Sequence, residues 1–206
     1  MSMEVDLFLF QVTAANPSAA VDHQTVSAAA HDFVRRHLAE ACGRPPESLN
    51  FRRLPHGKPF LPDAPVCFNL SHCGRTVAAA FARTELGVDL EAVRPVRSGI
   101  AARFFTPEER RYLDESADES DRESRFFAVW TAKEAYLKRH GAGLAGGLHF
   151  TVANEAGLLP VIRSEAFPPC FLRHRELTFP SDADNRLFHL SLCTDRPATI
   201  RISIDF

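Results

Sequence analysis

The chain has 206 residues, which is enough for one hydrophobic core or for two small lobes that share one. Its net charge of −2 gives no electrostatic attraction to nucleic acid or to an anionic membrane, and no apolar run approaches the roughly 20 residues of a membrane helix. The acidic start is unlike a signal peptide, and the five cysteines form no C-x-x-C pair. We therefore expect a cytoplasmic protein with free thiols, without a nucleic acid or membrane partner.

Hydrophobic periodicity predicts one helix and several strands in the first half of the chain. The expected elements are a strand over residues 4–12, a helix from about Ser18 to Cys42, two strands within 66–82 joined by a tight turn at 72–75, and a strand over 86–93. Gly43 and the two prolines that follow it end the predicted helix.

Helices come first after Pro95, and strands follow. Thr106, Pro107 and Glu109 form the start of a helix with a capping box. The acidic segment 114–124 is expected to be a solvated link, and the strongest helical pattern covers 125–143, with Gly141 just past its end. The remaining strands are expected at 149–153, 158–162, 170–177, 187–193 and 198–206.

One short sequence occurs twice. "FNLSHC" at 68–73 matches "FHLSLC" at 188–193 in four of six positions, although a match this short can arise by chance. Together with the repeated order of helix and strands, it predicts an α+β fold of two similar halves. The expected division is into residues 1–95 and 96–206.

The strand "GVDLE" carries two acids on one face. Residues two apart in a strand project to the same side, so Asp89 and Glu91 point together. Their repulsion needs compensation, either by a nearby arginine or by a divalent cation held by carboxylate oxygens. The two acids alone do not decide between these alternatives.

The helix "WTAKEAYLK" adds a third acid and two lysines. Glu134 and Lys138 lie one turn apart, and Lys133 is adjacent. By itself this pattern is typical of an exposed ion pair beside a buried Trp130. Combined with Asp89 and Glu91, it also provides three carboxylates for a metal ion and two ammonium groups for phosphate.

The turn "SHCGR" offers groups for an anion. Ser71, His72 and Arg75 surround Gly74, so backbone N–H groups and two basic side chains are available there. The chain contains no G-x-x-x-x-G-K-[ST], G-x-G-x-x-G or G-x-S-x-G sequence, which argues against a P-loop, a dinucleotide site and a nucleophile elbow.

Five motifs occur in a recognisable order: "GKP" (57–59), "FNLSH" (68–72), "GVDLE" (87–91), "RFFTPEE" (103–109) and "WTAKEAYLK" (130–138). Over roughly residues 50–145 the chain resembles a 4′-phosphopantetheinyl transferase of the two-lobed, surfactin-synthetase-activating type. The resemblance implies two pseudo-symmetric α/β lobes in one monomer, with coenzyme A in the cleft between them. The implied reaction moves phosphopantetheine from coenzyme A to a serine of an apo acyl or peptidyl carrier protein and releases 3′,5′-ADP.

The resemblance also implies roles for individual residues. Asp89, Glu91 and Glu134 would hold Mg²⁺, or alternatively Mn²⁺, against the diphosphate, and Glu134 would act as the base toward the carrier serine. Lys133 and Lys138 would bind the phosphate of the leaving group. His72 would contact the 3′-phosphate, with Arg75 or Arg36 as further candidates, because no Lys or Arg precedes Arg35. The implied lining of the adenine pocket is Gly57, Lys58, Pro59 and Ser71.

Two other functions use the same residues. A Mg²⁺-dependent phosphodiesterase also combines acids and lysines, but its polymer would need a basic groove that the near-neutral charge does not indicate. A non-catalytic module that binds coenzyme A or a carrier is the other alternative, against which the complete set of acids and helix lysines argues. For the carrier, we expect a basic rim of Arg103, Arg110, Arg111 and Arg125. Phe104 and Phe105 are expected either in an apolar contact with the carrier or in the core.

Overall fold

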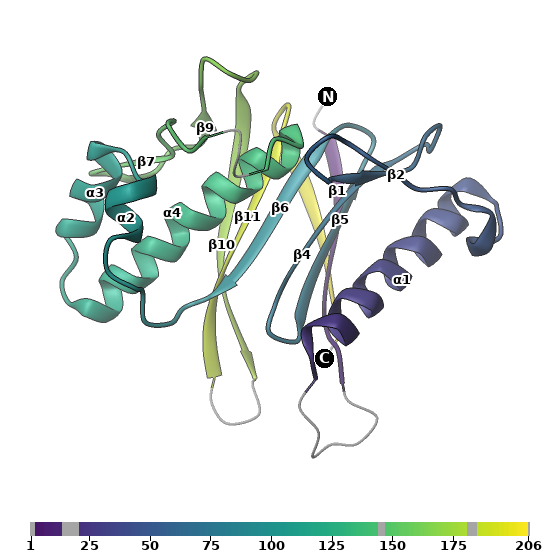
Figure 1. Cartoon of the computed structure of the whole chain (residues 1–206), viewed down its shortest axis with the longest axis horizontal. Helices are drawn as coiled ribbons and strands as arrows, with labels where there is room; N and C mark the ends of the chain where they lie inside the picture. Colours follow the sequence, from purple (N-terminus) through teal and green to yellow (C-terminus); the bar gives the residue numbers. More distant parts are fainter. Residues whose placement is uncertain (1–2, 14–20, 144–146, 181–184, 206) are drawn as a thin grey trace.

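The computed structural model describes residues 3–13, 21–143, 147–180 and 185–205. Two four-stranded sheets pack face to face, with one long helix on the outside of each (Figure 1). The strand orders are β12-β1-β5-β4 and β6-β11-β10-β9. This mixture of helices and largely antiparallel sheets confirms the predicted α+β class.

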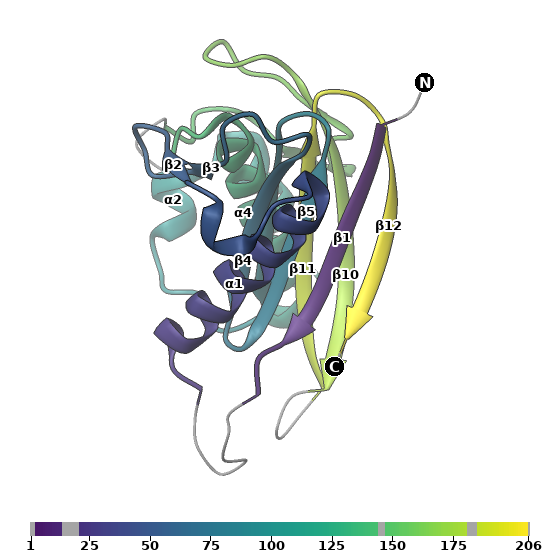
Figure 2. The ribbon, with the colours of Figure 1, turned by 90° about the vertical axis from the view of Figure 1, so that its right-hand side faces the viewer.

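The first sheet joins both ends of the described chain. It contains β1 (Met3–Gln11), β4 (Cys67–Cys73), β5 (Thr76–Ala82) and β12 (Ala198–Asp205). Figure 2 shows β12 running beside β1, with which it pairs in parallel. The helix α1 (His23–Cys42) covers the outer face; Asp22 caps its start by accepting from the Thr25 N–H, and Gly43 ends it with a φ of 61°.

The second sheet contains β6 (Leu86–Ala92), β9 (Val161–Ile162), β10 (Cys170–Pro180) and β11 (Asn185–Thr194). Between β6 and β9 the chain forms α2 (Ile100–Phe104), α3 (Pro107–Asp114) and α4 (Glu119–His140), and α4 crosses the outer face of this sheet (Figure 1). The short elements are η1 (Pro46–Ser48), β2 (Arg52–Arg53), β3 (Pro59–Phe60), β7 (Ala153–Asn154) and β8 (Gly157–Leu158).

Every second residue of the strands points inward, and these residues build the core between the two sheets. Val5, Leu7 and Leu9 of β1 meet Val88 and Leu90 of β6 in one buried cluster, and all five are almost fully shielded from solvent. Small residues at 78, 80 and 82 of β5 allow the two sheets to approach closely. Among the described residues, no helix combines the length and hydrophobicity needed to cross a bilayer.

The two sheets meet along β4 and β6. At this junction, backbone N–H groups of β6 bind side chains of β4 instead of its backbone. The Val88 N–H donates to Oδ1 of Asn69 at 2.8 Å, and the Ala92 N–H donates to Sγ of Cys73 at 3.3 Å. The polar residues of the "FNLSHC" motif therefore satisfy one edge of β6, while its other edge pairs with β11. This junction places Ser71 beside Asp89.

Several predicted boundaries differ from the structure. The helix expected at 125 begins at Glu119, because Asp118 accepts from the Asp121 N–H and acids in a first turn favour the helix dipole. The predicted solvated link is correspondingly shorter. The helix expected from Ser18 begins at His23, and residues 18–20 lie outside the described residues.

The two sheets do not correspond to residues 1–95 and 96–206. β6 lies before residue 95 but pairs with β11 in the second sheet, and β12 lies after it but pairs with β1 in the first sheet. The order β1-β5-β4 also repeats as β6-β11-β10, which makes β4 the counterpart of β10. The similar motifs at 68–73 and 188–193 lie on β4 and β11, so they do not mark equivalent strands.

Candidate active site

Gly87 brings the acid-bearing strand against α4. Gly87, Asp89 and Glu91 share the face of β6 that α4 covers, and a Cβ at Gly87 would lie 2.0 Å from the Ala135 carbonyl oxygen. Only glycine allows this approach. The close packing carries Glu134 and Lys138 of α4 to the same face as the two acids.

Three elements meet at Asp89, a residue that is only 4% exposed. Oδ1 of Asp89 accepts from Nζ of Lys138 at 2.6 Å and from Oγ of Ser71 at 2.8 Å. Lys138 also donates to Oγ of Ser71 at 2.9 Å, which closes a triangle between β4, β6 and α4. Oδ2 of Asp89 is buried and has no hydrogen-bond partner. An unpaired buried carboxylate oxygen is costly, and a cation or donor from a ligand would satisfy it.

Glu134 has an altered acidity. Burial, together with the negative charges of Asp89 and Glu91 and against the opposing charge of Lys138, raises the pKa of Glu134 to about 7. A carboxyl group that titrates near neutral pH can hold or release a proton under ordinary conditions. The same repulsion that raises this pKa would be removed by a cation placed among the acids.

Glu91 is compensated by an arginine. Its Oε2 accepts from Nη1 of Arg94 at 2.8 Å, and Sγ of Cys73 donates to the same oxygen at 3.5 Å. The donor oxygens of Asp89, Glu91 and Glu134 do not form a set within 4.8 Å of one another. The three carboxylates, one with an orphaned oxygen, nevertheless fit the ligand preference of Mg²⁺ or Mn²⁺.

Lys133 does not reach this site. Its side chain is fully buried on another face of α4, where Nζ pairs with Oε2 of Glu109 at 2.9 Å and donates to the carbonyl oxygens of Leu148 and Phe150. The predicted contact of Lys133 with phosphate is therefore wrong in this structure. The physical reason is that positions 133 and 134 point roughly 100° apart around the helix.

The "GKP" turn lies at the ends of β6 and α4. Gly57 has a φ of 90°, and its N–H donates to the Leu54 carbonyl oxygen at 2.8 Å, so the turn needs glycine. Lys58 is 9% exposed, and its Nζ binds Glu85 and the carbonyl oxygens of Leu86 and Arg139. Lys58 thus anchors the turn, while Pro59 begins β3. A place for these residues in an adenine pocket stays a prediction.

His72 points away from Asp89. Ser71 and His72 are neighbours in β4 and project to opposite faces, so His72 faces the start of α1, where the His23 ring lies 4.7 Å away. Partial burial lowers the pKa of His72, and the charges of His23 and Lys138 lower it further. Arg75 follows Gly74 in the turn, and its carbonyl oxygen accepts from the Val12 N–H.

Comparisons with known proteins show the family to which this chain belongs. A family model described as the 4′-phosphopantetheinyl transferase superfamily matches residues 85–188, which include β6 and all of α4. A Bacillus subtilis 4′-phosphopantetheinyl transferase is 32% identical over 80% of this chain and 71% of its own length. The chain belongs to the 4′-phosphopantetheinyl transferase superfamily. The predicted resemblance is confirmed.

Two further relatives carry the same family name. The Bacillus pumilus 4′-phosphopantetheinyl transferase psf-1 is 31% identical over 81% of this chain and 69% of its own length. The 4′-phosphopantetheinyl transferase HetI of a Nostoc species is 36% identical over 60% of this chain and 55% of its own length.

This superfamily member contains groups that the sequence did not identify as part of the site. Arg94 neutralises Glu91, and the His23 ring contacts the His72 ring edge-on. Arg94 follows the "GVDLE" motif by three residues, so its proximity could have been anticipated. His23 had no signal, because its contact with β4 depends on how α1 crosses the sheet.

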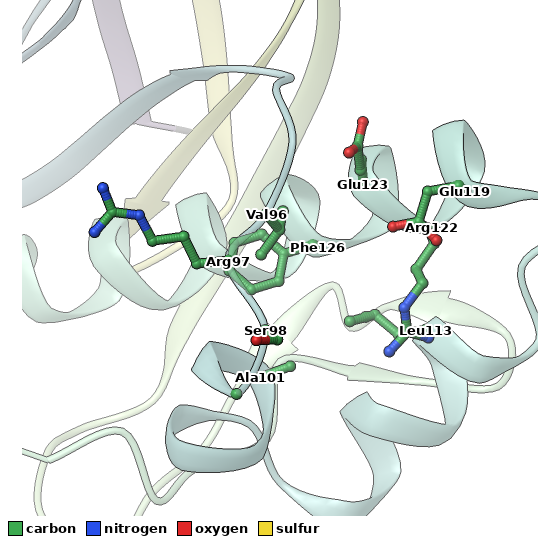
Figure 3. Close-up of a pocket in the computed structure, with 10 residues that line it drawn as sticks. Val96, Arg97, Ser98, Ala101, Leu113, Glu119, Arg122, Glu123 and Phe126 are labelled. Atoms are coloured by element: carbon green, nitrogen blue, oxygen red, sulfur yellow. The ribbon is translucent and has the colours of Figure 1, made fainter.

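The transferase also has a pocket that is separate from Asp89, Glu91 and Glu134. This pocket of about 310 Å³ lies between the segment before α2 and the N-terminal half of α4. Figure 3 shows residues that line it. Its lining includes Arg97, Arg122, Glu123 and Phe126, but neither Glu134 nor Lys138. Of the two phenylalanines expected either to contact the carrier or to lie in the core, Phe105 is 6% exposed and belongs to the core. Arg103, of the expected basic rim, lies over the ring of Phe104.

Proposed function

We propose that this transferase moves 4′-phosphopantetheine from coenzyme A to a serine of an apo acyl or peptidyl carrier protein. In the reaction, the serine Oγ bonds to the phosphorus next to the pantetheine, and the phosphorus–oxygen bond to the departing 3′,5′-ADP breaks. The observation that carries this proposal is Glu134, with a pKa of about 7, beside Asp89 and Lys138. One face of α4 thereby provides both a proton acceptor and a cation.

Glu134 is the proposed base. In its ionised form it accepts the proton of the carrier serine as the oxygen attacks phosphorus, directly or through water. A pKa near 7 is well matched to this role because the group is substantially ionised yet still basic at neutral pH. Asp89, Glu91 and Glu134 would hold Mg²⁺ or Mn²⁺, which supplies positive charge against the diphosphate when bound.

Lys138 is the proposed phosphate contact. Its Nζ lies 2.6 Å from Asp89, and its side chain is 29% exposed, so the ammonium group remains accessible to a ligand. An ammonium group at this position favours the negative charge that develops on the leaving diphosphate. Because Lys133 is fully buried, Lys138 carries this role without it.

The proposal places the active site between two lobes of one monomer. One lobe is α1 with the sheet that ends in β4, and the other is α4 with the sheet that begins at β6. Ser71 and Lys138 come from opposite sides of the β4–β6 junction and contact the same carboxylate, which supports this placement. His72, His23, Arg75 and the 57–59 turn are proposed to contact the nucleotide part of coenzyme A. All five cysteines are free thiols, which fits a cytoplasmic location.

The direct test is loading of apo carrier proteins by the purified chain with coenzyme A and Mg²⁺, followed by mass spectrometry. We expect the carrier to gain one phosphopantetheine and Glu134→Gln to slow turnover by about 10²–10⁴-fold while coenzyme A still binds. Glu119→Gln, on the exposed first turn of the same helix, is the matched control and should load normally. Loading by Glu134→Gln at the wild-type rate would remove Glu134 from the proposed role.

A further inference from the structure

A second cluster of ligand-type side chains lies under the N-terminal half of α4. His174 and Glu176 of β10 and His189 of β11 each offer one donor atom, and these atoms all lie within 4.8 Å of one another. Nε2 of His174 lies 3.0 Å from Nδ1 of His189. Among the described residues, this is the one group of three or more such side chains that meets that distance.

In each histidine, the ring nitrogen that does not face the other histidine contacts a serine hydroxyl group. Nδ1 of His174 lies 3.0 Å from Oγ of Ser191, and Nε2 of His189 lies 2.9 Å from Oγ of Ser124 on α4. Metal-bound histidines characteristically donate their second N–H to such an oxygen, which fixes the ring and its tautomer. Both inner nitrogens thus point toward the same space between the rings.

The hydrogen bonds that link Thr131, Ser191 and His174 bear on the tautomer of His174. Where the Thr131 hydroxyl donates to the Ala128 carbonyl oxygen, Ser191 donates to Thr131. In that arrangement Ser191 accepts from Nδ1–H of His174, which leaves Nε2 of a neutral His174 ring with a free lone pair. A neutral imidazole with a free lone pair is the form of histidine that binds a metal ion.

We propose that His174, His189 and Glu176 form a site for a divalent transition metal of the zinc class, separate from the acids of the active site. Two histidines and one carboxylate match the ligand types of zinc sites that keep a fourth position for water. Binding shifts the remaining proton of His189 to Nε2, from which it is donated to Ser124. Ligand nitrogens on tetrahedral zinc lie roughly 3.3 Å apart, so the observed 3.0 Å needs to open only slightly.

The site has a route to solvent and borders the catalytic acids. Glu176 is exposed, while His189 is 1% exposed, so an ion would enter past Glu176. His189 pairs across the strands with Glu91. An effect of zinc on carrier loading would therefore not identify the site, and binding has to be measured directly.

The test is a Co²⁺ titration of the purified full chain in excess Mg²⁺, followed by visible absorption and by competition with Zn²⁺. We expect one tetrahedral Co²⁺ per chain, without the charge-transfer band of a thiolate ligand. Glu176→Gln and Ser124→Ala should weaken binding by about 10–100-fold, since they remove a ligand and the oxygen that orients His189. The exposed changes Glu165→Gln and His149→Gln are matched controls and should leave the affinity unchanged.

Three outcomes would overturn the proposal. They are absence of Co²⁺ binding to the wild-type chain, a spectrum dominated by thiolate ligands, and equal affinity in Glu176→Gln, Ser124→Ala and the controls. Glu176 is exposed, so its substitution should fold normally, and circular dichroism of each variant verifies this.

Discussion

Two lysines five residues apart on α4 form ion pairs with very different consequences. Lys133 and Glu109 are both 0% exposed, and they bind backbone groups of two segments, Thr106 at the start of α3 and the loop that contains Phe150 and Val152. Lys138 is 29% exposed and shares Asp89 with Ser71 and an orphaned carboxylate oxygen. The first pair is complete and holds α3 to α4, whereas the second is incomplete and remains open to a ligand. The structural pair differs from the proposed functional pair in its burial and in the completeness of its hydrogen bonds, not in the types of residue that form it.

The largest expected effect comes from breaking the buried pair. Lys133→Met leaves the Glu109 carboxylate uncompensated, so we expect the free energy of unfolding at pH 7 to fall by about 3–5 kcal/mol. Burial already raises the pKa of Glu109, and Lys133 opposes that shift. Without Lys133 the folded pKa rises further, so the loss should shrink as the pH falls and Glu109 is protonated. Urea unfolding at pH 7 and pH 5 measures both effects.

Adding Glu109→Gln to Lys133→Met is the control for this prediction. The neutral amide oxygen can still accept a hydrogen bond from the Thr106 or Val152 N–H, so part of the stability should return. A loss below about 1 kcal/mol in Lys133→Met alone would show that the pair is not the structural element described here.

The open pair should respond in the opposite way. We expect Lys138→Gln to lower the loading rate by about 10²–10³-fold, because it removes a positive group at the leaving phosphate. The free energy of unfolding should change by less than in Lys133→Met, since Asp89 keeps its hydrogen bond to Ser71. Stopped loading assays and urea unfolding on both variants compare the two lysines, and a larger stability loss at 138 than at 133 would reverse the assignment.

Glu134→Gln should become more stable than wild type at pH 8 without Mg²⁺. The folded state raises the pKa of Glu134 to about 7 from an ordinary 4.5, so folding favours the protonated form. Wild-type stability therefore falls as pH rises from about 4.5 to 7, on the order of 1–3 kcal/mol. Glutamine lacks this penalty. The difference between the two proteins should disappear near pH 4, and thermal unfolding across this range would refute the prediction if the curves stayed parallel.

The smallest expected effect concerns Arg94, whose side chain is 48% exposed. Arg94→Ala removes a surface ion pair, so the free energy of unfolding should change by less than about 1 kcal/mol. It also frees Glu91 from its competing cation, so the Mg²⁺ concentration for half-maximal loading should fall a few-fold. A rise in that concentration instead would mean that Arg94 orients Glu91 rather than competing for it.

The sequence predicted local geometry well and long-range geometry less well. The shared face of Asp89 and Glu91, the capping box at Thr106 and the end of α4 at Gly141 all follow from strand or helix periodicity and from short-range hydrogen bonds. The burial of Lys133 could not be predicted from the sequence, because its partner Glu109 lies 24 positions earlier. The capping box already accounted for an acid at position 109, so nothing in the sequence indicated a second, tertiary contact for Glu109.

The His174–His189 pair was missed for a related reason. Its members lie on neighbouring strands, and their proximity depends on the register that sets His174 opposite Ser191 and Glu176 opposite His189. Register depends on the inward pattern of both sheets, which a single strand does not reveal. The similar motifs at 68–73 and 188–193 likewise did not indicate which strands are equivalent.

The most direct measurement is a crystal structure with coenzyme A and Mn²⁺, in which anomalous scattering locates the ion. We expect an Mn²⁺ peak bound by carboxylate oxygens of Asp89, Glu91 and Glu134 and facing the diphosphate, with Lys133 still paired to Glu109. A peak elsewhere, or three acids that point apart in the complex, would contradict this expectation.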